Sequence, residues 1–257
     1  MKALLAEHLV LMLPGQNLNE AELVAFARLF GAPHEMLDQD RRRHPTHKAL
    51  GLLASPVAGT DLHNYADMWH SDGSHEESPE SVSMFQMVKT SPRGGDTLWS
   101  NQYAAFQALS GPMQALARTL TGVHHHHGTK YIEGIRPDHE HPIVPVHPVT
   151  GRDFLYVTNG YLSHIPQLRK TESRMVLDYL RAISVQPEFT IRRSHSPGDI
   201  VVWDNWATMH YGAHDFDPME GRLVWRVGVD TGAPMLSAHP EGLGPHFDQS
   251  RAQARLV

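Results

Sequence analysis

Apolar residues near the start of the chain change their spacing around Pro14. Residues 9–13 form a short apolar run, which is typical of a strand, whereas the apolar positions between 23 and 30 recur with the spacing of one helix face. Asn19 and Glu22 stand at the start of the helical stretch with the spacing of a capping box. The pattern therefore predicts a strand over residues 9–13 and a helix directly after it.

Farther along the chain, short strand-like runs alternate with a few helical stretches. Helices are predicted over residues 102–109, 110–121 and 171–183. Strands are predicted over residues 82–88, 96–100, 142–147, 153–157, 189–194, 199–205 and 222–230. Many short strands with a few flanking helices are typical of a double-sheet jelly roll.

No internal repeat and no linker divides this pattern. We therefore expect a single domain over residues 1–257, mainly β with flanking helices, built as a cupin-like double-stranded β-helix (jelly roll). A chain of 257 residues is long enough for one such domain with a substantial core. Residues 237–257 are polar and contain glycine and proline, so we expect them to form a loosely held tail.

Composition narrows the chemistry that the chain can perform. The sequence contains no cysteine, so any metal must be held by histidine and carboxylate groups. The formal net charge of −6 argues against a nucleic-acid-binding surface. No apolar run is long enough to cross a bilayer, and residues 1–8 lack the apolar core of a secretion signal. We therefore expect a cytoplasmic protein that binds neither nucleic acid nor membrane.

Two histidine-containing motifs stand far apart in the sequence. His70 and Asp72 are two residues apart, so on an extended chain their side chains project from the same face, with their Cα atoms about 6–7 Å apart. His210 follows the strand-like run over residues 199–205 and must come from another strand. Two histidines and one carboxylate are the ligand set of a non-haem Fe(II) site. With 20 histidines in the chain, an H-x-D triplet occurs about once by chance, so the hypothesis depends on the combination.

The last predicted strand carries two arginines. Arg222 and Arg226 share one face with Val224, while the apolar residues between them share the other. If the apolar face packs on helices, both arginines point into the barrel, where a guanidinium needs an anion and matches a carboxylate group. One alternative stays open, which is that either arginine is paired with a structural Asp or Glu.

Two polar segments are expected to be loops. Residues 75–81 contain three acidic side chains and a proline, and residues 124–141 begin with four consecutive histidines. Long loops in compact domains are often lids or binding loops. Consecutive histidines on an extended chain point to alternate faces, so at most two of the four readily share one ion. Both readings, a polar loop and a second metal site, stay open.

Taken together, these motifs resemble a known family. The succession of W-H-S-D-G-S, P-R-G-G-D-T-L-W-S-N, G-D-I-V-V-W-D-N-W-A-T-M-H-Y and R-L-V-W-R is similar to that of the TauD/TfdA family of Fe(II)/2-oxoglutarate-dependent dioxygenases, from about residue 5 to residue 232. The resemblance implies that His70, Asp72 and His210 bind iron and form the catalytic centre. It further implies that Thr97 and Arg222 hold the distal carboxylate of 2-oxoglutarate.

The resemblance also bears on the substrate. It implies that Arg226 binds the acid group of the substrate, and we expect Gly73 and Tyr161 to line the same pocket, although Tyr161 is equally suited to the core. Taurine-oxidising members carry an asparagine at the position of Ala66, so taurine itself is disfavoured.

We therefore expect hydroxylation of a small anionic organic substrate, such as a sulfonate, alkyl sulfate, aryloxyalkanoate or amino-acid-like acid, using O2 and 2-oxoglutarate and releasing succinate and CO2. The alternatives are desaturation or oxidative rearrangement with the same cofactors, and a non-catalytic cupin-like binding protein. We also expect a homo-oligomer, either a dimer or a tetramer.

Overall fold

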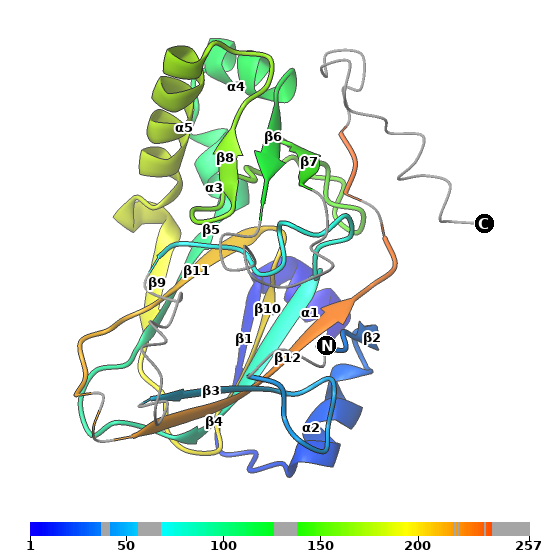
Figure 1. Cartoon of the computed structure of the whole chain (residues 1–257), viewed down its shortest axis with the longest axis vertical. Coiled ribbons are helices and arrows are strands. Elements are labelled where there is room, and N and C mark those ends of the chain that lie inside the picture. The colour runs from blue at the N-terminus through cyan, green and yellow to red at the C-terminus, as the bar shows by residue number, and fades with distance from the viewer. Residues whose placement is uncertain are drawn as a thin grey trace.

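Two antiparallel sheets form the centre of the molecule (Figure 1). The computed structural model describes residues 1–36, 42–55, 68–125, 138–217, 219, 221–233 and 235–237. The larger sheet has the order β1-β10-β4-β12-β2, with β3 also paired to β12, and the smaller sheet has the order β11-β5-β9. The strands of the larger sheet are β1 (Val10–Leu13), β2 (Ala32–Pro33), β3 (Gly51–Ser55), β4 (Val82–Lys89), β10 (Ile200–Asp204) and β12 (Arg222–Asp230). Those of the smaller sheet are β5 (Thr97–Asn101), β9 (Thr190–Arg193) and β11 (Thr208–Gly212).

The two sheets enclose an aromatic core. Trp99 of β5 packs against Phe85 of β4 and Trp203 of β10, with ring centroids 6.4 and 6.0 Å apart. All three side chains are buried, and Val224 of β12 joins the same cluster. Burying such large rings on the facing sides of both sheets stabilises the sandwich and fixes the spacing between the sheets.

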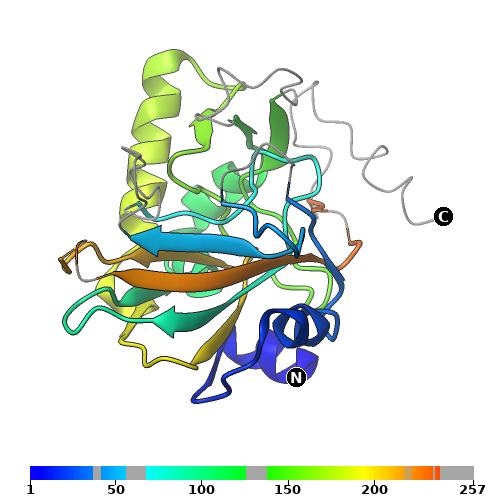
Figure 2. The same cartoon turned by 60° about the horizontal axis from the view of Figure 1, so that its bottom comes forward.

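The outer face of the larger sheet is covered by the first two helices. These are α1 (Lys2–His8) and α2 (Glu20–Ala27), which lie against one side of that sheet (Figure 2). Leu23 and Ala27 of α2 are fully buried in one cluster with Val227 of β12. The alternation predicted for β12 is confirmed, because Val227 packs outward on the helix while Val224 faces the inner core.

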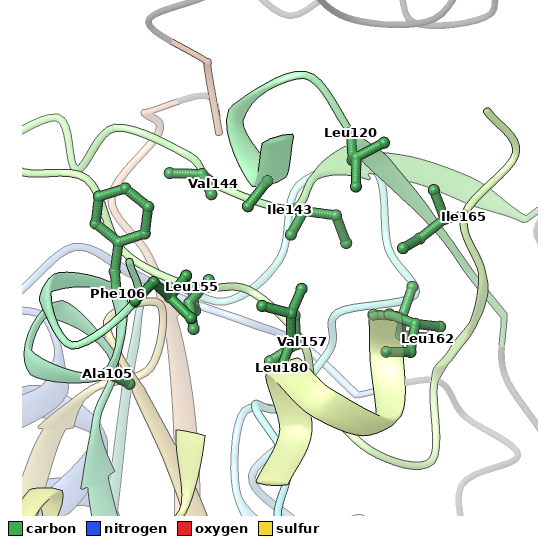
Figure 3. Close-up of a cluster of buried hydrophobic side chains, with 13 residues drawn as sticks. Ala105, Phe106, Leu120, Ile143, Val144, Leu155, Val157, Leu162, Ile165 and Leu180 are labelled. Carbon is green, nitrogen blue, oxygen red and sulfur yellow. The ribbon is translucent and has the colours of Figure 1, made fainter. Parts of the chain in front are cut away.

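A third layer stands at the other end of the molecule. It combines a small sheet of order β7-β6-β8 with α3 (Gln102–Gln107), α4 (Gly111–Arg118) and α5 (Lys170–Ser184). The strands are β6 (Thr121–His124), β7 (His139–Pro142) and β8 (Leu162–His164), and a 3-10 helix (Pro187–Phe189) follows α5. Figure 3 shows their shared apolar cluster, in which Ile143 and Leu155 meet Leu180 of α5. This layer carries one wall of the site described below.

Most predicted elements are confirmed. The capping box at Asn19 and Glu22 is present at α2, and each predicted helix corresponds to a helix in the structure. The predicted strands over residues 142–147 and 153–157 are wrong. These segments share an isolated bridge between Val146 and Asp153 but form no ladder, because Pro142, Pro145 and Pro148 offer no backbone N–H. The sequence reasoning also missed α1 and the short strands of the small sheet.

Several predictions fall on residues that the structure leaves out. The predicted tail lies outside the described residues apart from Ser237, and so does Ala66. Among the described residues, no helix is long and apolar enough to cross a membrane. The jelly roll of flanked antiparallel sheets is confirmed.

Candidate metal and co-substrate site

The two metal-site histidines are held face to face by their own backbones. His70 donates its N–H to the carbonyl of His210 at 2.9 Å, and His210 donates to the carbonyl of His70 at 2.8 Å. His210 belongs to β11, whereas His70 lies in an isolated bridge outside any strand. The strand geometry expected for the H-x-D triplet is therefore wrong in detail, because Asp72 already begins a turn. The reciprocal backbone pair brings the two rings to a centroid distance of 4.1 Å.

Asp72 completes a compact group of three ligand atoms. His70 Nε2 lies 3.6 Å from Asp72 Oδ1, and His210 Nε2 lies 3.5 Å from Asp72 Oδ2. One atom from each residue lies within 4.8 Å of the others, as the ligands of a single ion do. His70 Nδ1 is 2.7 Å from the carbonyl of Met68, so it must donate its proton there. With its proton on Nδ1, the ring keeps a free lone pair on Nε2, which can bind the ion that the three residues would share.

The backbone of Asp72 is clamped by Asn205. Asn205 Oδ1 accepts the Asp72 N–H at 2.9 Å, and Asn205 Nδ2 donates to the Asp72 carbonyl at 2.9 Å. Nδ2 also donates to the carbonyl of Glu80 at 2.7 Å. Asn205 is fully buried directly after β10, so a rigid strand end positions the carboxylate ligand. The sequence reasoning treated Asn205 only as the end of a strand.

The electrostatic environment keeps His210 and Asp72 in the protonation states that suit a bound cation. Burial lowers the pKa of His210 to about 3, with His70 adding to the effect, so its imidazole is neutral at physiological pH. Burial alone would raise the pKa of Asp72, but Arg226 and His210 hold it well below its usual value. A neutral imidazole and an ionised carboxylate are the protonation states that a metal requires. The donor set of two nitrogens and one carboxylate therefore fits a facial non-haem metal site.

A second part of the same cavity is suited to an anionic co-substrate. Thr97 of β5 and Arg222 of β12 both line the cavity that contains the three metal-site residues. Arg222 Nε is buried and has no hydrogen-bond partner among the residues that the structure describes. A buried guanidinium N–H without an acceptor is costly, and a carboxylate would satisfy it. The arrangement fits the distal carboxylate of 2-oxoglutarate.

The glycines before Thr97 shape this end of the cavity. Gly94 and Gly95 both have positive φ, at 67° and 74°. A Cβ on Gly94 would collide with the backbone oxygen of Asp215, whose carboxylate accepts the Gly95 N–H at 2.9 Å. The turn therefore needs glycine, and it leads the chain straight into Thr97.

Arg226 has a different environment from Arg222. Its Nη2 lies 2.8 Å from Asp72 Oδ2 and also contacts the carboxylate of Glu80. Burial alone would lower the pKa of Arg226, but Asp72 and Glu80 raise it above its usual value. The open alternative for Arg226, pairing with an acidic side chain, is thus what the structure contains. Its contact with the substrate's acid group stays a prediction.

Glu80 is a site residue that the sequence reasoning missed. It lies in the segment expected to be a polar loop, yet it is buried and reaches Arg226 because Gly228 leaves room for it. Ser83 Oγ is 3.1 Å from Asp72 Oδ2 and 3.3 Å from Glu80 Oε2, so it links the two carboxylates. Only its buried position, two residues before β4, distinguishes Glu80 from the other acidic residues of this segment.

The predicted substrate-pocket residues Gly73 and Tyr161 both line the cavity. The ring of Tyr161 stacks on His75 with centroids 5.1 Å apart, so this tyrosine forms part of the pocket wall rather than the core. Burial and nearby Asp72 raise its pKa to about 12, which keeps the phenol protonated. Gly73 has a positive φ of 65° in the turn after Asp72.

Residues 124–141 were expected to form a loop, but both ends of this segment belong to strands. His124 ends β6 and His141 lies in β7, and both are buried, because they belong to the small sheet. His124 Nδ1 lies 3.1 Å from Ser74 Oγ, and His141 donates through Nε2 to the carbonyl of Glu76 at 2.9 Å. These contacts brace the turn after Asp72. The described part of the chain contains no second metal-ligand cluster, and residues 126–137 lie outside it.

A jelly roll that directs two histidines and a carboxylate at one cavity defines the class of non-haem metal enzymes with a facial triad. Within that class, the chain belongs to the TauD/TfdA family of dioxygenases, because residues 1–227 match the family described as "Taurine catabolism dioxygenase TauD, TfdA family". The resemblance noted in the sequence is therefore confirmed.

The names of individual relatives include different substrates. The alpha-ketoglutarate-dependent 2,4-dichlorophenoxyacetate dioxygenase of Cupriavidus pinatubonensis is 31% identical, over 81% of this chain and 80% of that protein. A Schizosaccharomyces pombe protein, provisionally named an alpha-ketoglutarate-dependent sulfonate dioxygenase, is 28% identical over 91% of this chain, which spans 63% of that protein. A taurine dioxygenase structure from Burkholderia xenovorans matches with a TM-score of 0.77 and 30% identity, over 94% of this chain and 82% of that one.

Proposed function

We propose that the protein is an Fe(II)- and 2-oxoglutarate-dependent dioxygenase (alpha-ketoglutarate is the same compound) that hydroxylates a small anionic organic substrate and releases succinate and CO2. The main supporting observation is that one cavity contains both the His70–Asp72–His210 group and Arg222, whose Nε has no hydrogen-bond partner in the described part of the chain. A binding protein would have no need to combine a metal group with a separate carboxylate site.

Each part of the site has a defined task in this proposal. His70, Asp72 and His210 would hold Fe(II), which with O2 and the co-substrate supplies the oxidising chemistry. Arg222 and Thr97 would bind the distal carboxylate of 2-oxoglutarate and so fix its orientation. Trp203 and Phe85 provide apolar cavity wall, which limits access of water to the reacting groups.

The substrate is expected to lie beside Tyr161 and Gly73, with its acid group towards Arg226. The relatives support an anionic substrate, because the names of two of them include a sulfonate and a chlorinated phenoxyacetate. The stacked pair of Tyr161 and His75 provides a flat, partly polar surface for either kind of molecule. Cytoplasmic location and a homo-oligomeric state stay predictions, as does the choice of hydroxylation over desaturation or rearrangement.

The proposal is tested by comparing substrate-dependent succinate release in the wild type and in the Asp72→Ala variant. Purified protein with Fe(II), 2-oxoglutarate and O2 is screened against sulfonates, alkyl sulfates, aryloxyalkanoates and acylated amino acids. We expect at least one acid to stimulate succinate release in the wild type and none to do so in Asp72→Ala. Asp178→Ala, which changes an exposed carboxylate on α5, is the matched control and should retain activity. Full activity of Asp72→Ala would refute the proposed metal site.

A further inference from the structure

Thr97 has a polar neighbour behind it that none of the predicted roles includes. His195 follows β9, and its Nε2 lies 3.1 Å from Thr97 Oγ1. The imidazole meets the rings of Phe85 and Trp99 edge-on, at interplanar angles of 87° and 89°. Thr97 lines the cavity, and His195 contacts it from the other side. Aromatic packing therefore holds the imidazole in a fixed position against the threonine hydroxyl.

The Thr97 hydroxyl has one proton, which it can donate either to His195 or to a ligand in the cavity. If Thr97 donates to His195 Nε2, only oxygen lone pairs face the cavity, and they repel a carboxylate. If His195 carries its proton on Nε2 and donates to Thr97 Oγ1, the threonine proton is free to point into the cavity. A carboxylate only accepts hydrogen bonds, so it needs the second arrangement.

We propose that His195 is a positioning residue of the co-substrate site, which donates from Nε2 to Thr97 Oγ1 and so directs the Thr97 hydroxyl proton at the distal carboxylate of 2-oxoglutarate. This inference rests on the proposed function. It gives the carboxylate two direct donors, Thr97 of β5 and Arg222 of β12, and gives His195 the task of orienting the first of them.

The charge state of His195 agrees with this role. Burial and the nearby Arg222 lower the pKa of His195 to about 4, so the ring is neutral at physiological pH. A neutral ring has one N–H, and its placement on Nε2 or Nδ1 decides whether Thr97 donates or accepts. Because a neutral imidazole has this choice, binding of the carboxylate selects the Nε2–H form.

The experiment compares two 2-oxo acids of equal length. The Fe(II)-loaded protein is titrated without oxygen, and the visible charge-transfer band reports the Kd of 2-oxoglutarate and of 2-oxopentanoate, which lacks the distal carboxylate. The variant His195→Phe keeps an aromatic ring against Phe85 and Trp99 but cannot donate. We expect its Kd for 2-oxoglutarate to rise by up to about tenfold, because the Thr97 hydroxyl loses the donor that fixes its orientation, with the Kd for 2-oxopentanoate unchanged.

Further variants separate positioning from structural damage. His195→Gln keeps an N–H donor and should retain most of the affinity for 2-oxoglutarate. Thr97→Val removes the donor hydroxyl itself, so it should weaken 2-oxoglutarate binding at least as much as His195→Phe does, and the double variant should be no weaker than Thr97→Val alone. The inference is overturned if His195→Phe binds 2-oxoglutarate like the wild type, if both acids weaken equally, or if the two substitutions add. Absence of the band in the wild type would instead refute the proposed function.

Discussion

Arg222 and Arg226 stand four residues apart on one face of β12, yet their surroundings differ. Arg226 contacts the carboxylates of Asp72 and Glu80, whereas Arg222 Nε has no hydrogen-bond partner within the described residues. Acidic neighbours raise the pKa of Arg226, whereas burial lowers the pKa of Arg222. On one strand, Arg226 is thus paired with carboxylates at the metal end of the cavity, whereas Arg222 has an N–H available for an anion.

The difference shows that a shared face does not imply a shared role. A buried guanidinium with its donors satisfied contributes to the folded state, and one with an unsatisfied donor is destabilising until a ligand completes it. The prediction that both arginines point into the barrel is consistent with the structure, since both line the cavity. Their separate roles depend on neighbours supplied by other strands and turns.

Removal of Arg226 should have the largest effect. Arg226→Leu leaves the carboxylates of Asp72 and Glu80 buried without their cation. We expect the metal-free protein to lose about 3–5 kcal/mol of unfolding free energy, measured by urea denaturation. Added Fe(II) should recover part of the loss, because the ion neutralises Asp72.

Arg222→Leu is the matched control for that measurement. Because Arg222 has an unsatisfied donor, its removal should change the stability of the metal-free protein by less than about 1 kcal/mol and strongly weaken 2-oxoglutarate. Equal destabilisation by the two substitutions would contradict the distinction between the arginines.

The pH dependence of stability should separate the two ends of the cavity. The pKa of His195, about 4, lies below its usual value of 6.5, so the unfolded chain binds more protons between these values and stability falls as pH drops through that window. The pKa of Asp72 is also lowered, so its contribution is present above its usual value of 3.8 and is lost at lower pH. Between pH 7 and pH 4, the unfolding free energy of His195→Phe should therefore fall by about 2 kcal/mol less than that of the wild type.

Urea denaturation at a series of pH values measures this difference. His8→Phe, which replaces an exposed histidine, controls for the substitution of phenylalanine for histidine as such. If His195→Phe and the wild type lose stability in parallel over this window, the ring of His195 is not held neutral by its surroundings.

The smallest expected effect concerns the anion that Arg226 prefers. Glu80→Gln removes one of the two negative charges beside Arg226, so an external acid group meets less competition. We expect methanesulfonate, detected by its perturbation of the charge-transfer band, to bind about fivefold more tightly to this variant. Glu77→Gln, an exposed position in the same segment, should behave like the wild type. An unchanged affinity would argue that Arg226 does not bind the acid group of the substrate.

Much of this site could be read from the sequence because its chemistry requires particular residue types. Only histidine and carboxylate were available as metal ligands without cysteine, and His70, Asp72 and His210 do come together. Thr97 and Arg222 were found through their motifs, and both line the same cavity. The helix at Asn19 was found because a capping box is a local signal.

The missed residues have no such local signal. Glu80, Asn205 and His195 act across 146, 133 and 98 residues of sequence, through Arg226, Asp72 and Thr97. The two strands predicted over residues 142–147 and 153–157 failed for a related reason: the two segments lie side by side and share an isolated bridge, but prolines in the first segment remove the N–H groups that a ladder needs.

The sequence by itself determined which groups are present for chemistry: the histidines, the carboxylate, the threonine and two arginines on one strand face. Tertiary structure alone decided their states. It paired Arg226 with Glu80, left Arg222 Nε without a hydrogen-bond partner among the described residues, and placed His195 beside Thr97. The physical reason is that periodicity within a strand decides which face a side chain occupies, whereas its charge balance and hydrogen bonds depend on residues that only folding brings within a few ångströms.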